Sequence, residues 1–303
     1  MVGRSTLAIV AAYAACVLIW GTTWFAIKLS LHGFPPVTGA GVRFVAAGAI
    51  LYATAIVLRI DLARKPPPFH LIAVLALTMF GVNYALTYFA ETQLPSGLVA
   101  VLFGTLPFFV FGFAGVMVGE RVSWTTLVGA ACALCGVATI SLVGDVRGRL
   151  LYVFAALGAS ASSGFANVYL KRYSYVEPLA TLPPAMLLGG AGMIAWGARF
   201  EHTDWVAATS ASSLYAIAYL AVCGSAIAFY LNHWLLQRID SGIVGLSALL
   251  IPVIAVAVGA LLGRELLGPR DLAGAALVIG GLWLSLVRPA THVKPTVESQ
   301  VSA

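Results

Sequence analysis

The chain has 303 residues, of which 61% are hydrophobic and 9% are charged, with a formal net charge of +6. A soluble domain carries about 25% charged residues, so this composition excludes a soluble globular enzyme, a disordered protein and a secreted disulfide scaffold. The charges stand in short clusters between long uncharged runs, and a bilayer-spanning helix needs about 20 mostly apolar residues. The composition therefore predicts an all-α membrane protein that crosses the bilayer many times.

Ten apolar segments of spanning length follow one another along the chain. They cover residues 6–28, 36–58, 70–91, 95–118, 122–144, 149–171, 178–198, 211–237, 241–263 and 269–287. The loops between them are short, and Pro or Gly marks several of them, as in Gly33-Phe34-Pro35-Pro36. No loop is long enough to fold as a separate soluble domain, so we expect ten transmembrane helices.

The distribution of Lys and Arg predicts the orientation of the chain. With the N-terminus in the cytoplasm, the inner side carries ten of these residues and the outer side six, and Arg43 remains inside a span. Cytoplasmic loops carry an excess of Lys and Arg, so we expect a multi-pass protein of the cell inner (plasma) membrane with both termini cytoplasmic. The positive charge needs no nucleic-acid partner, because the inner loops face anionic lipid headgroups.

The sequence matches itself at an offset of 145 residues. The matching pairs include Pro107 with Pro252, Gly129 with Gly274, Gly136 with Gly281 and, after a two-residue adjustment, Gly21 with Gly164. Each repeat holds five spans, and because five is odd the second repeat enters the membrane from the opposite side. We therefore expect a five-plus-five inverted repeat, with repeats at 1–145 and 146–288 and a disordered cytoplasmic tail at 289–303. Inverted repeats recur in secondary transporters, whose substrate site lies near the midplane between the halves.

Three motifs carry a resemblance to a known family. They are Trp20-Gly21-Thr22-Thr23-Trp24-Phe25, Arg43-Phe44 and Ser96…Leu106-Pro107-Phe108…Gly119-Glu120-Arg121. These motifs resemble those of EamA-type members of the drug/metabolite transporter superfamily, and among them the YddG-like amino-acid exporters. The resemblance covers about residues 6–287 and implies a ten-helix inverted fold that exports small metabolites. The second half departs from the pattern, since Arg264-Glu265 reverses Glu120-Arg121 and Ser163-Gly164 replaces the Trp-Gly pair.

Polar and aromatic side chains share one face in the third and in the eighth span. Residues three and four apart lie on the same helix face, and the repeat offset places the two faces at equivalent positions. Lipid-facing positions gain nothing from such groups, so both faces are expected to point into a central cavity. The candidate substrate-binding residues are Asn83, Tyr84, Thr87, Tyr88, Asn232, His233, Trp20 and Asn167. The alternative is that these groups hydrogen-bond between helices with no ligand present.

Pro107 and Pro252 lie in the middle of their spans, and each leaves the carbonyl four residues back without its helical donor. We predict that they act as gating hinges, with fixed packing kinks as the alternative. Arg43 lies about 10 Å along its helix from Pro36, at 1.5 Å per residue. It either attracts a substrate carboxylate or extends outward to the membrane surface. His233 either bonds in the interior or relays a proton.

The charge inventory limits the class of substrate. Sugar nucleotides need several Lys or Arg residues in the cavity, and polycations need carboxylates there, whereas Arg43 is the sole charged candidate in mid-span. We therefore predict a secondary transporter that exports small uncharged or zwitterionic metabolites, above all amino acids including aromatic ones, by alternating access. The alternatives are a transporter of the same fold for drugs, purines or nucleotide sugars, a passive channel, and an intramembrane hydrolase that uses Ser247 and His233.

We expect no enzyme activity, no cofactor and no metal. The four cysteines lie in apolar runs and are expected to pack as small apolar side chains. The sequence has no Gly-x-x-x-x-Gly-Lys-Ser/Thr phosphate loop, so ATP is not the direct energy source. The expected partners are a small-molecule substrate and the lipid bilayer, and the chain is expected to be a monomer or a weak homodimer.

Overall fold

The structure is a computed structural model that describes residues 4–62, 66–118, 124–141, 146–173, 175–239, 244, 247–262 and 268–286. All regular structure in these residues is helical. The elements are α1 (Arg4–Ser30), α2 (Pro36–Val57), α3 (Phe69–Leu75), η1 (Ala76–Val82), α4 (Asn83–Glu91), α5 (Ser96–Phe103), α6 (Leu106–Val118), α7 (Trp124–Ser141), α8 (Val146–Lys171), α9 (Pro178–Phe200), α10 (Trp205–Ala208), α11 (Ala211–Ala221), η2 (Val222–Ile227), α12 (Ala228–Leu236), α14 (Ser247–Leu262) and α15 (Pro269–Leu286), where η marks a π-helix. The expected tail at 289–303 lies outside the described residues.

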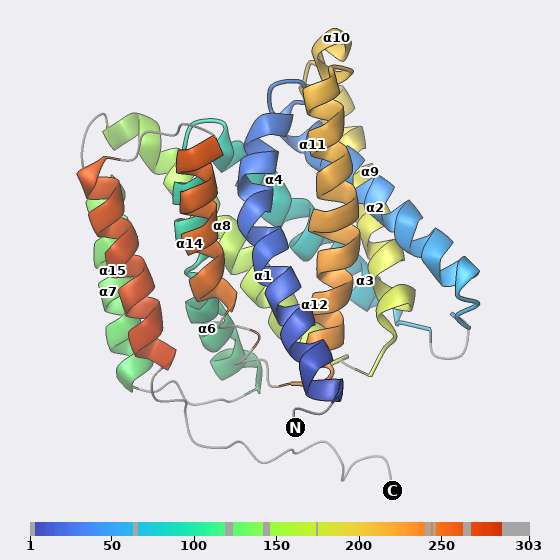
Figure 1. Cartoon of the computed structure of the whole chain (residues 1–303), viewed down its shortest axis with the longest axis horizontal. Helices are drawn as coiled ribbons and strands as arrows, with labels where there is room; N and C mark the ends of the chain where they lie inside the picture. Colours follow the sequence, from blue (N-terminus) through green and yellow to red (C-terminus); the bar gives the residue numbers. More distant parts are fainter. Residues whose placement is uncertain are drawn as a thin grey trace, which may run out of the picture.

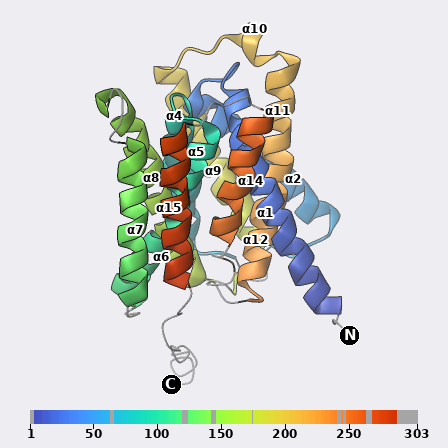
Figure 2. The same cartoon turned by 60° about the vertical axis from the view of Figure 1, so that its left-hand side comes forward.

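The ten expected spans are confirmed. The third span is the continuous helix α3–η1–α4, the fourth is α5 followed by α6, and the eighth is α11–η2–α12. Seven spans are long and apolar enough to cross a membrane by length and composition. The helices α7, α14 and α15, of 16 to 18 residues, complete the ten. They form a bundle in which α1 begins and α15 ends at the same end (Figures 1 and 2).

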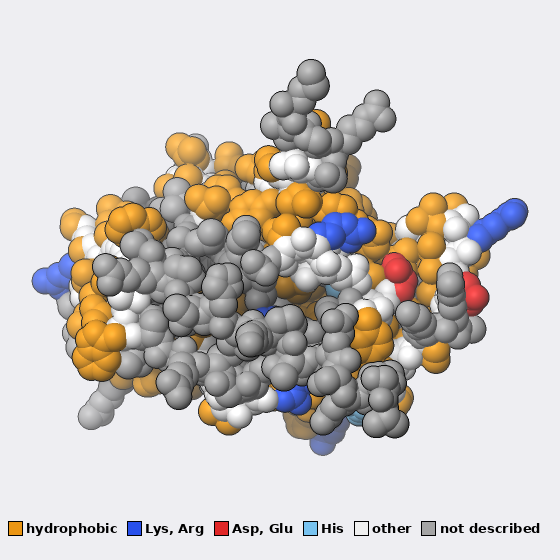
Figure 3. Space-filling view, turned by 90° about the horizontal axis from the view of Figure 1, so that it is seen from below, with side chains coloured by type: hydrophobic (Ala, Val, Ile, Leu, Met, Phe, Trp, Pro, Cys, Tyr) orange, Lys and Arg blue, Asp and Glu red, His pale blue; other side chains and the backbone are white. Residues whose placement is uncertain are grey.

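The outside of the bundle is apolar. Large hydrophobic side chains such as Ile56, Val116 and Trp283 are 72%, 89% and 63% exposed, as expected for helices whose outer faces contact lipid. Charged side chains instead gather at the ends of the helices. Figure 3 views the end where α1 begins, and Lys and Arg side chains stand out at its rim.

The two halves pack through reciprocal glycine contacts. The helices α7 and α15 lie side by side (Figure 2), and a Cβ added to Gly136 would lie 2.6 Å from the carbonyl oxygen of Gly274. On the same interface, a Cβ on Gly281 would meet the carbonyl oxygen of Gly129. Because Gly129 and Gly136 are the repeat partners of Gly274 and Gly281, each contact is the counterpart of the other.

The same reciprocity holds where α1 crosses α14 and where α8 crosses α6. Gly21 lies against Ile254, and its repeat partner Gly164 lies against Phe109, the repeat partner of Ile254. Matched contacts of this kind arise when two units are related by a two-fold axis. The fold is therefore the expected all-α bundle of two inverted five-helix repeats.

Two charged side chains secure helix ends where α1 ends and α2 begins. The carboxylate of Glu201 accepts hydrogen bonds from the amides of Val37 and Thr38, at 2.9 and 2.8 Å. The ammonium group of Lys28 donates to the carbonyl of Glu91, at 2.7 Å, in the last turn of α4. Both charges have the sign that the helix dipole favours at the end they occupy, so they fix the ends of α2 and α4.

The orientation of the bundle can be tested with single cysteines at Tyr175 and His202, two exposed residues in the loops that flank α9. The 23 residues of α9 separate the two sites by about 34 Å. In a background without the four native cysteines, a membrane-impermeant maleimide should label His202→Cys in intact cells. Tyr175→Cys should react only after permeabilisation. Labelling of both from outside would contradict a spanning α9, and the reverse pattern would contradict cytoplasmic termini.

Candidate functional site

The candidate site is built around two π-helical turns, η1 and η2. Shifted by the repeat offset of 145 residues, η1 covers positions 221–227, which matches η2 within one residue. A π-turn is rare, usually occurs as a single bulge inside an α-helix, and is frequent at functional sites. It also changes the hydrogen bonds of the backbone, and carbonyls in both turns accept bonds from side chains. Thr78 O accepts from Ser162 Oγ at 2.8 Å, and Gly224 O accepts from Arg43 Nη2 at 3.0 Å.

Arg43 is fully buried on α2. Its Nε donates to the hydroxyl of Ser225 at 2.7 Å, next to the bond to Gly224, while Nη1 has no hydrogen-bond partner among the described residues. Its Cζ lies 4.7 Å from the ring centroid of Tyr84 and 5.2 Å from that of Phe44, within the range of cation–π attraction. The side chain therefore points into the bundle, and of the two alternatives for Arg43 the extension to the membrane surface is not seen in this conformation.

Five aromatic rings from both halves surround this point, and we call them the aromatic cluster. They are Trp20, Phe44, Phe80, Tyr84 and Phe229. Ring centroids lie 4.6 Å apart for Phe44 and Tyr84, 5.2 Å for Phe80 and Phe229, and 5.6 Å for Trp20 and Phe229. Such edge-to-face contacts stabilise the packing beyond the area that they bury. The cluster brings together α1, α2, η1, α4 and α12.

The candidates of the third span lie inside the bundle. Asn83, Thr87 and Tyr88 are each less than 4% exposed. Asn83 donates to the carbonyl of Met79 at 3.1 Å, and Thr87 donates to the Asn83 side chain at 3.4 Å. Both bonds lie within the third span. Asn83 and Thr87 therefore do not form the bonds between helices that are expected if these groups only hold the helices together. The Tyr88 hydroxyl is buried with no hydrogen-bond partner among the described residues.

The candidates of the eighth span are also enclosed. Asn232 is 9% exposed and His233 is 2% exposed, and neither ring nitrogen of His233 has a hydrogen-bond partner in the described part of the chain. Buried polar atoms are nearly always bonded to protein or to water, so such a group calls for a specific explanation. The hydroxyl of Ser247 donates to Val244 O at 2.7 Å and not to His233. The pair that the hydrolase alternative needs is therefore not formed.

The remaining two candidates differ from each other. Trp20 belongs to the aromatic cluster, and its indole N–H is buried without a partner among the described residues. Asn167 donates to the carbonyl of Ser163 at 2.9 Å, within its own helix α8. The structure thus brings Trp20 to the centre together with Tyr84, whereas Asn167 is engaged on α8.

The two prolines have different surroundings. Before Pro107 the fourth span is interrupted, since α5 ends at Phe103 and α6 begins at Leu106. The carbonyl of Phe103, which the proline leaves without a helical donor, accepts from Ser160 Oγ at 3.1 Å. Pro252 instead lies inside the helix α14. The structure thus shows a helix interruption next to Pro107 and a continuous helix at Pro252. The gating role of both prolines stays a prediction.

Sequence reasoning missed the partners of Arg43 and both π-turns. A π-turn has no sequence pattern of its own, so the sequence does not distinguish η1 and η2 from an ordinary α-helix. A usable signal was present at Gly224 and Ser225, because a small residue next to a hydroxyl allows a neighbouring side chain to reach the backbone. Among the described residues, no group of three His, Cys, Asp or Glu side chains is arranged to hold a metal ion.

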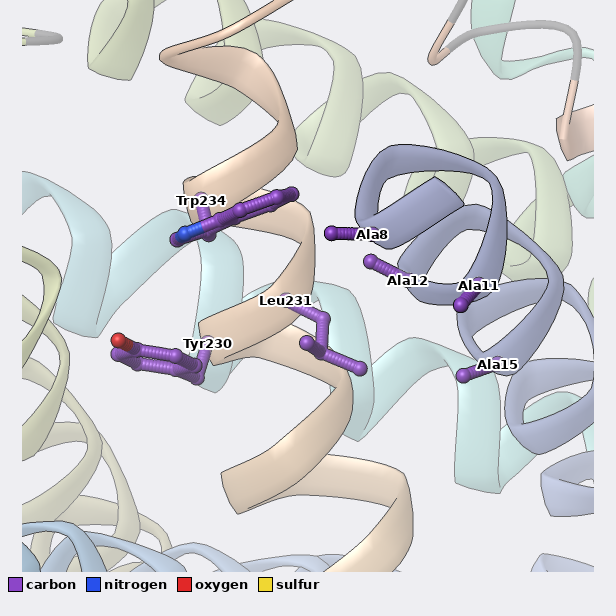
Figure 4. Close-up of a pocket in the computed structure, with 7 residues that line it drawn as sticks. All are labelled: Ala8, Ala11, Ala12, Ala15, Tyr230, Leu231 and Trp234. Carbon is purple, nitrogen blue, oxygen red and sulfur yellow. The ribbon is translucent and has the colours of Figure 1, made fainter. Parts of the chain in front are cut away.

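A separate groove of about 370 Å³ opens between α1 and α12. Its lining is Ala8, Ala11, Ala12, Ala15, Tyr230, Leu231 and Trp234 (Figure 4). Almost all of this lining is apolar, and the candidate residues Asn232 and His233 are not part of it. We therefore do not assign the substrate to this groove.

Comparison with known proteins agrees with this architecture. Over 305 residues the chain is 31% identical to the inner membrane transporter YedA of Escherichia coli K12, covering 97% of this chain and 96% of that protein. It is 26% identical to a probable amino-acid metabolite efflux pump of Salmonella typhimurium, covering 89% of this chain and 92% of the pump. One crystal structure, 20% identical, superposes with a TM-score of 0.70 over 93% of this chain and 97% of that chain, which supports the fold.

The family assignment rests on both halves of the chain. Residues 6–142 and 150–287 each match the EamA-like transporter family, so the two matches correspond to the two five-helix repeats of the fold. The relatives above are named as transporters, and none as an enzyme. The protein is a multi-pass membrane transporter, and it belongs to the EamA-like transporter family.

Proposed function

We propose that this transporter exports amino acids, aromatic ones included, from the cytoplasm by alternating access between its two repeats. The observation that carries the proposal is a set of buried polar atoms without hydrogen-bond partners on the helices that form the aromatic cluster. Within the described residues, Arg43 Nη1, the Tyr88 hydroxyl, the Trp20 indole and both His233 nitrogens have no hydrogen-bond partner. A small molecule with polar groups and an apolar side chain would satisfy such a site.

The charges favour a zwitterion over a strongly charged substrate. Arg43 supplies one positive charge, and it is the only Lys or Arg that is buried among the described residues. A diphosphate group is recognised by several cations, so nucleotide sugars fit this environment poorly. An amino acid presents one carboxylate, one ammonium group and a side chain that aromatic rings can contact.

Two of the relatives support the substrate class, and a third supports the location. The Salmonella relative and a second one from Escherichia coli, 27% identical over 292 residues, are both named as probable amino-acid metabolite efflux pumps. YedA is named as an inner membrane protein. By analogy we place this transporter in the inner membrane, with both termini in the cytoplasm.

Counterflow in proteoliposomes tests the proposal. Vesicles preloaded with one unlabelled amino acid at a time should accumulate the labelled form above its external concentration, because a carrier exchanges one for the other. A passive channel would equilibrate the label without accumulation. An imposed pH gradient, inside or outside acid, shows whether proton movement drives transport. Counterflow with purines or drugs but with no amino acid would assign the same fold to the alternative substrate class.

The Tyr88 hydroxyl distinguishes a substrate site from packing. Because this buried hydroxyl has no hydrogen-bond partner among the described residues, Tyr88→Phe should leave thermal stability unchanged or raise it. If the hydroxyl bonds the substrate, the lost bond costs about 1–3 kcal/mol, roughly a five- to hundredfold loss of affinity in counterflow. Asn232→Ala should lower affinity in the same way, and most for small polar amino acids.

A matched control exists at Tyr219, whose hydroxyl is hydrogen-bonded to Thr22. Tyr219→Phe should lower thermal stability slightly, since bonds between membrane helices contribute about 0.6 kcal/mol on average, and should leave substrate affinity at the parental value. Parental affinity in both Tyr88→Phe and Asn232→Ala would mean that these side chains serve packing, and the site would then lie elsewhere.

The two prolines should bias the transporter toward opposite states. Pro107→Ala restores an amide donor near the interruption between α5 and α6 and competes with the bond from Ser160 to Phe103. Pro252→Ala acts in the inverted repeat, so its effect should have the opposite sign. The reaction rate of a polar thiol reagent with Thr87→Cys, in a background without native cysteines, measures the change. Unchanged rates in both variants would make the prolines fixed kinks.

A further inference from the structure

The geometry points to Arg43 as the group that binds the substrate carboxylate, with Gly224 and Ser225 holding its guanidinium while the site is empty. This assignment rests on the proposed function, because it requires a substrate with a carboxylate. It names the residue that distinguishes amino acids from uncharged metabolites. It also names the element that moves when the substrate binds, the π-turn η2 of the eighth span.

The hydrogen bonds of Arg43 leave one of its nitrogen donors available to an anion. Its two hydrogen bonds go to neutral acceptors, the Ser225 hydroxyl and the Gly224 carbonyl, and Nη1 is without a partner in the described part of the chain. A buried guanidinium is best satisfied by a carboxylate, which accepts two parallel N–H bonds from it. An incoming carboxylate would use Nη1 and Nη2 together, and so would displace the carbonyl of Gly224.

The surroundings of Arg43 suit the rest of an amino acid. The guanidinium of Arg43 lies over the ring of Tyr84, and the hydroxyl of Tyr88, one helical turn further along the same span, has no hydrogen-bond partner among the described residues. The Tyr84 ring also belongs to the aromatic cluster, so an apolar side chain attached to the bound carboxylate would meet aromatic surface. The carboxylate and the side chain therefore have adjacent binding surfaces.

Gly224 is needed for this arrangement. A Cβ at this position would lie 3.2 Å from Arg43 Nη2 and 2.7 Å from a methyl carbon of Thr23 on α1. Both distances are shorter than ordinary van der Waals contacts, so a side chain would force Thr23, and to a smaller extent the guanidinium, to shift. The close approach of α1, α2 and η2 at this glycine thus places the cation.

The second repeat lacks the cation. With the two-residue adjustment, the position equivalent to Arg43 is Met186 on α9, which is fully buried. The residue equivalent to Gly224 is Met79 in η1, whose carbonyl accepts from Asn83 of the same span. Only the second-half π-turn is therefore held by a charge from another helix. When the substrate carboxylate displaces the Gly224 carbonyl from Arg43, the eighth span loses this bond to α2 and can move.

The test uses three probes in counterflow: phenylalanine, 3-phenylpropanoate, which lacks the ammonium group, and phenylalaninamide, which lacks the carboxylate. In the parent protein, 3-phenylpropanoate should compete with labelled phenylalanine at least about tenfold better than the amide. Arg43→Gln should raise the half-saturating concentration of phenylalanine about ten- to hundredfold and remove the preference for 3-phenylpropanoate. If another amino acid gives stronger counterflow, its own deaminated acid and its amide serve as probes.

Ser225→Ala is the matched control, because it removes a partner of Arg43 and keeps the charge. The preference for the carboxylate should then persist or increase, since the guanidinium has one competitor fewer. A purely structural Arg43 predicts the reverse, in which Arg43→Gln lowers stability and leaves the ranking of the probes unchanged. The preference of the parent protein for 3-phenylpropanoate over phenylalaninamide can be measured without any variant. Equal competition by the two probes therefore overturns the assignment even if Arg43→Gln does not fold.

Failure of the proposed function gives a different result. A parent protein that shows no counterflow with any amino acid refutes the proposed substrate class. Thermal stabilisation by 3-phenylpropanoate then still tests Arg43, because it requires binding and no transport. Stabilisation of the parent that is lost in Arg43→Gln supports the carboxylate site. No stabilisation of the parent, or equal stabilisation of the parent and Arg43→Gln, overturns it.

Discussion

Every interruption of a helix in a bilayer leaves backbone groups that water cannot satisfy, and this constraint organises the centre of the transporter. The structure describes three such interruptions, at η1, at η2 and between α5 and α6. At each one, a side chain from a neighbouring helix donates a hydrogen bond to a backbone carbonyl. Ser162 bonds to Thr78 in η1, Ser160 bonds to Phe103 at the end of α5, and Arg43 bonds to Gly224 in η2. The irregular backbone is thus confined to places where a polar side chain can reach it.

The way in which these interruptions are satisfied makes the two repeats unequal. Both interruptions of the first repeat are served by serines of α8, which belongs to the second repeat. The described interruption of the second repeat is served by an arginine of α2, which belongs to the first. A hydroxyl is a neutral group that can rotate between acceptors, whereas a guanidinium responds strongly to an anion. An inverted repeat with equivalent backbones can therefore respond to a substrate on one side of its pseudo-symmetry axis.

Much of the fold could be predicted from the sequence because the signals are physical and local. Apolar runs of spanning length mark the ten helices, and the offset between Gly129 and Gly274 indicates the repeat. The missing amide of Pro107 predicts a free carbonyl at Phe103, where Ser160 indeed donates. The burial of Asn83, Tyr88 and His233 also follows from their places on two faces. These predictions depend on periodicity and covalent chemistry, which a sequence contains in full.

The rest depends on how helices rotate and approach one another, which the sequence does not state. The direction of Arg43 remained open between the interior and the membrane surface, because both are reachable along its flexible side chain. In the structure Arg43 points to the interior, because the lack of a side chain at Gly224 lets α2 approach the eighth span. Likewise, the amide of Asn83 bonds within its own span, a choice that follows from the local π-turn.

The equivalent position in the second repeat shows that packing alone does not require a cation at Arg43. Met186 is buried as completely as Arg43 at the corresponding place on α9, so an apolar side chain can fill this site between helices. Transfer of a charge from water to a buried site costs several kcal/mol, and neutral acceptors compensate only part of that cost. Both π-turns have carbonyls that accept hydrogen bonds from side chains, and in η1 the donors are the neutral side chains of Asn83 and Ser162. What the guanidinium adds over a methionine is affinity for an anion. Among the described residues, the surroundings of Arg43 are otherwise aromatic or neutral, so that affinity is most useful where the substrate carries its carboxylate.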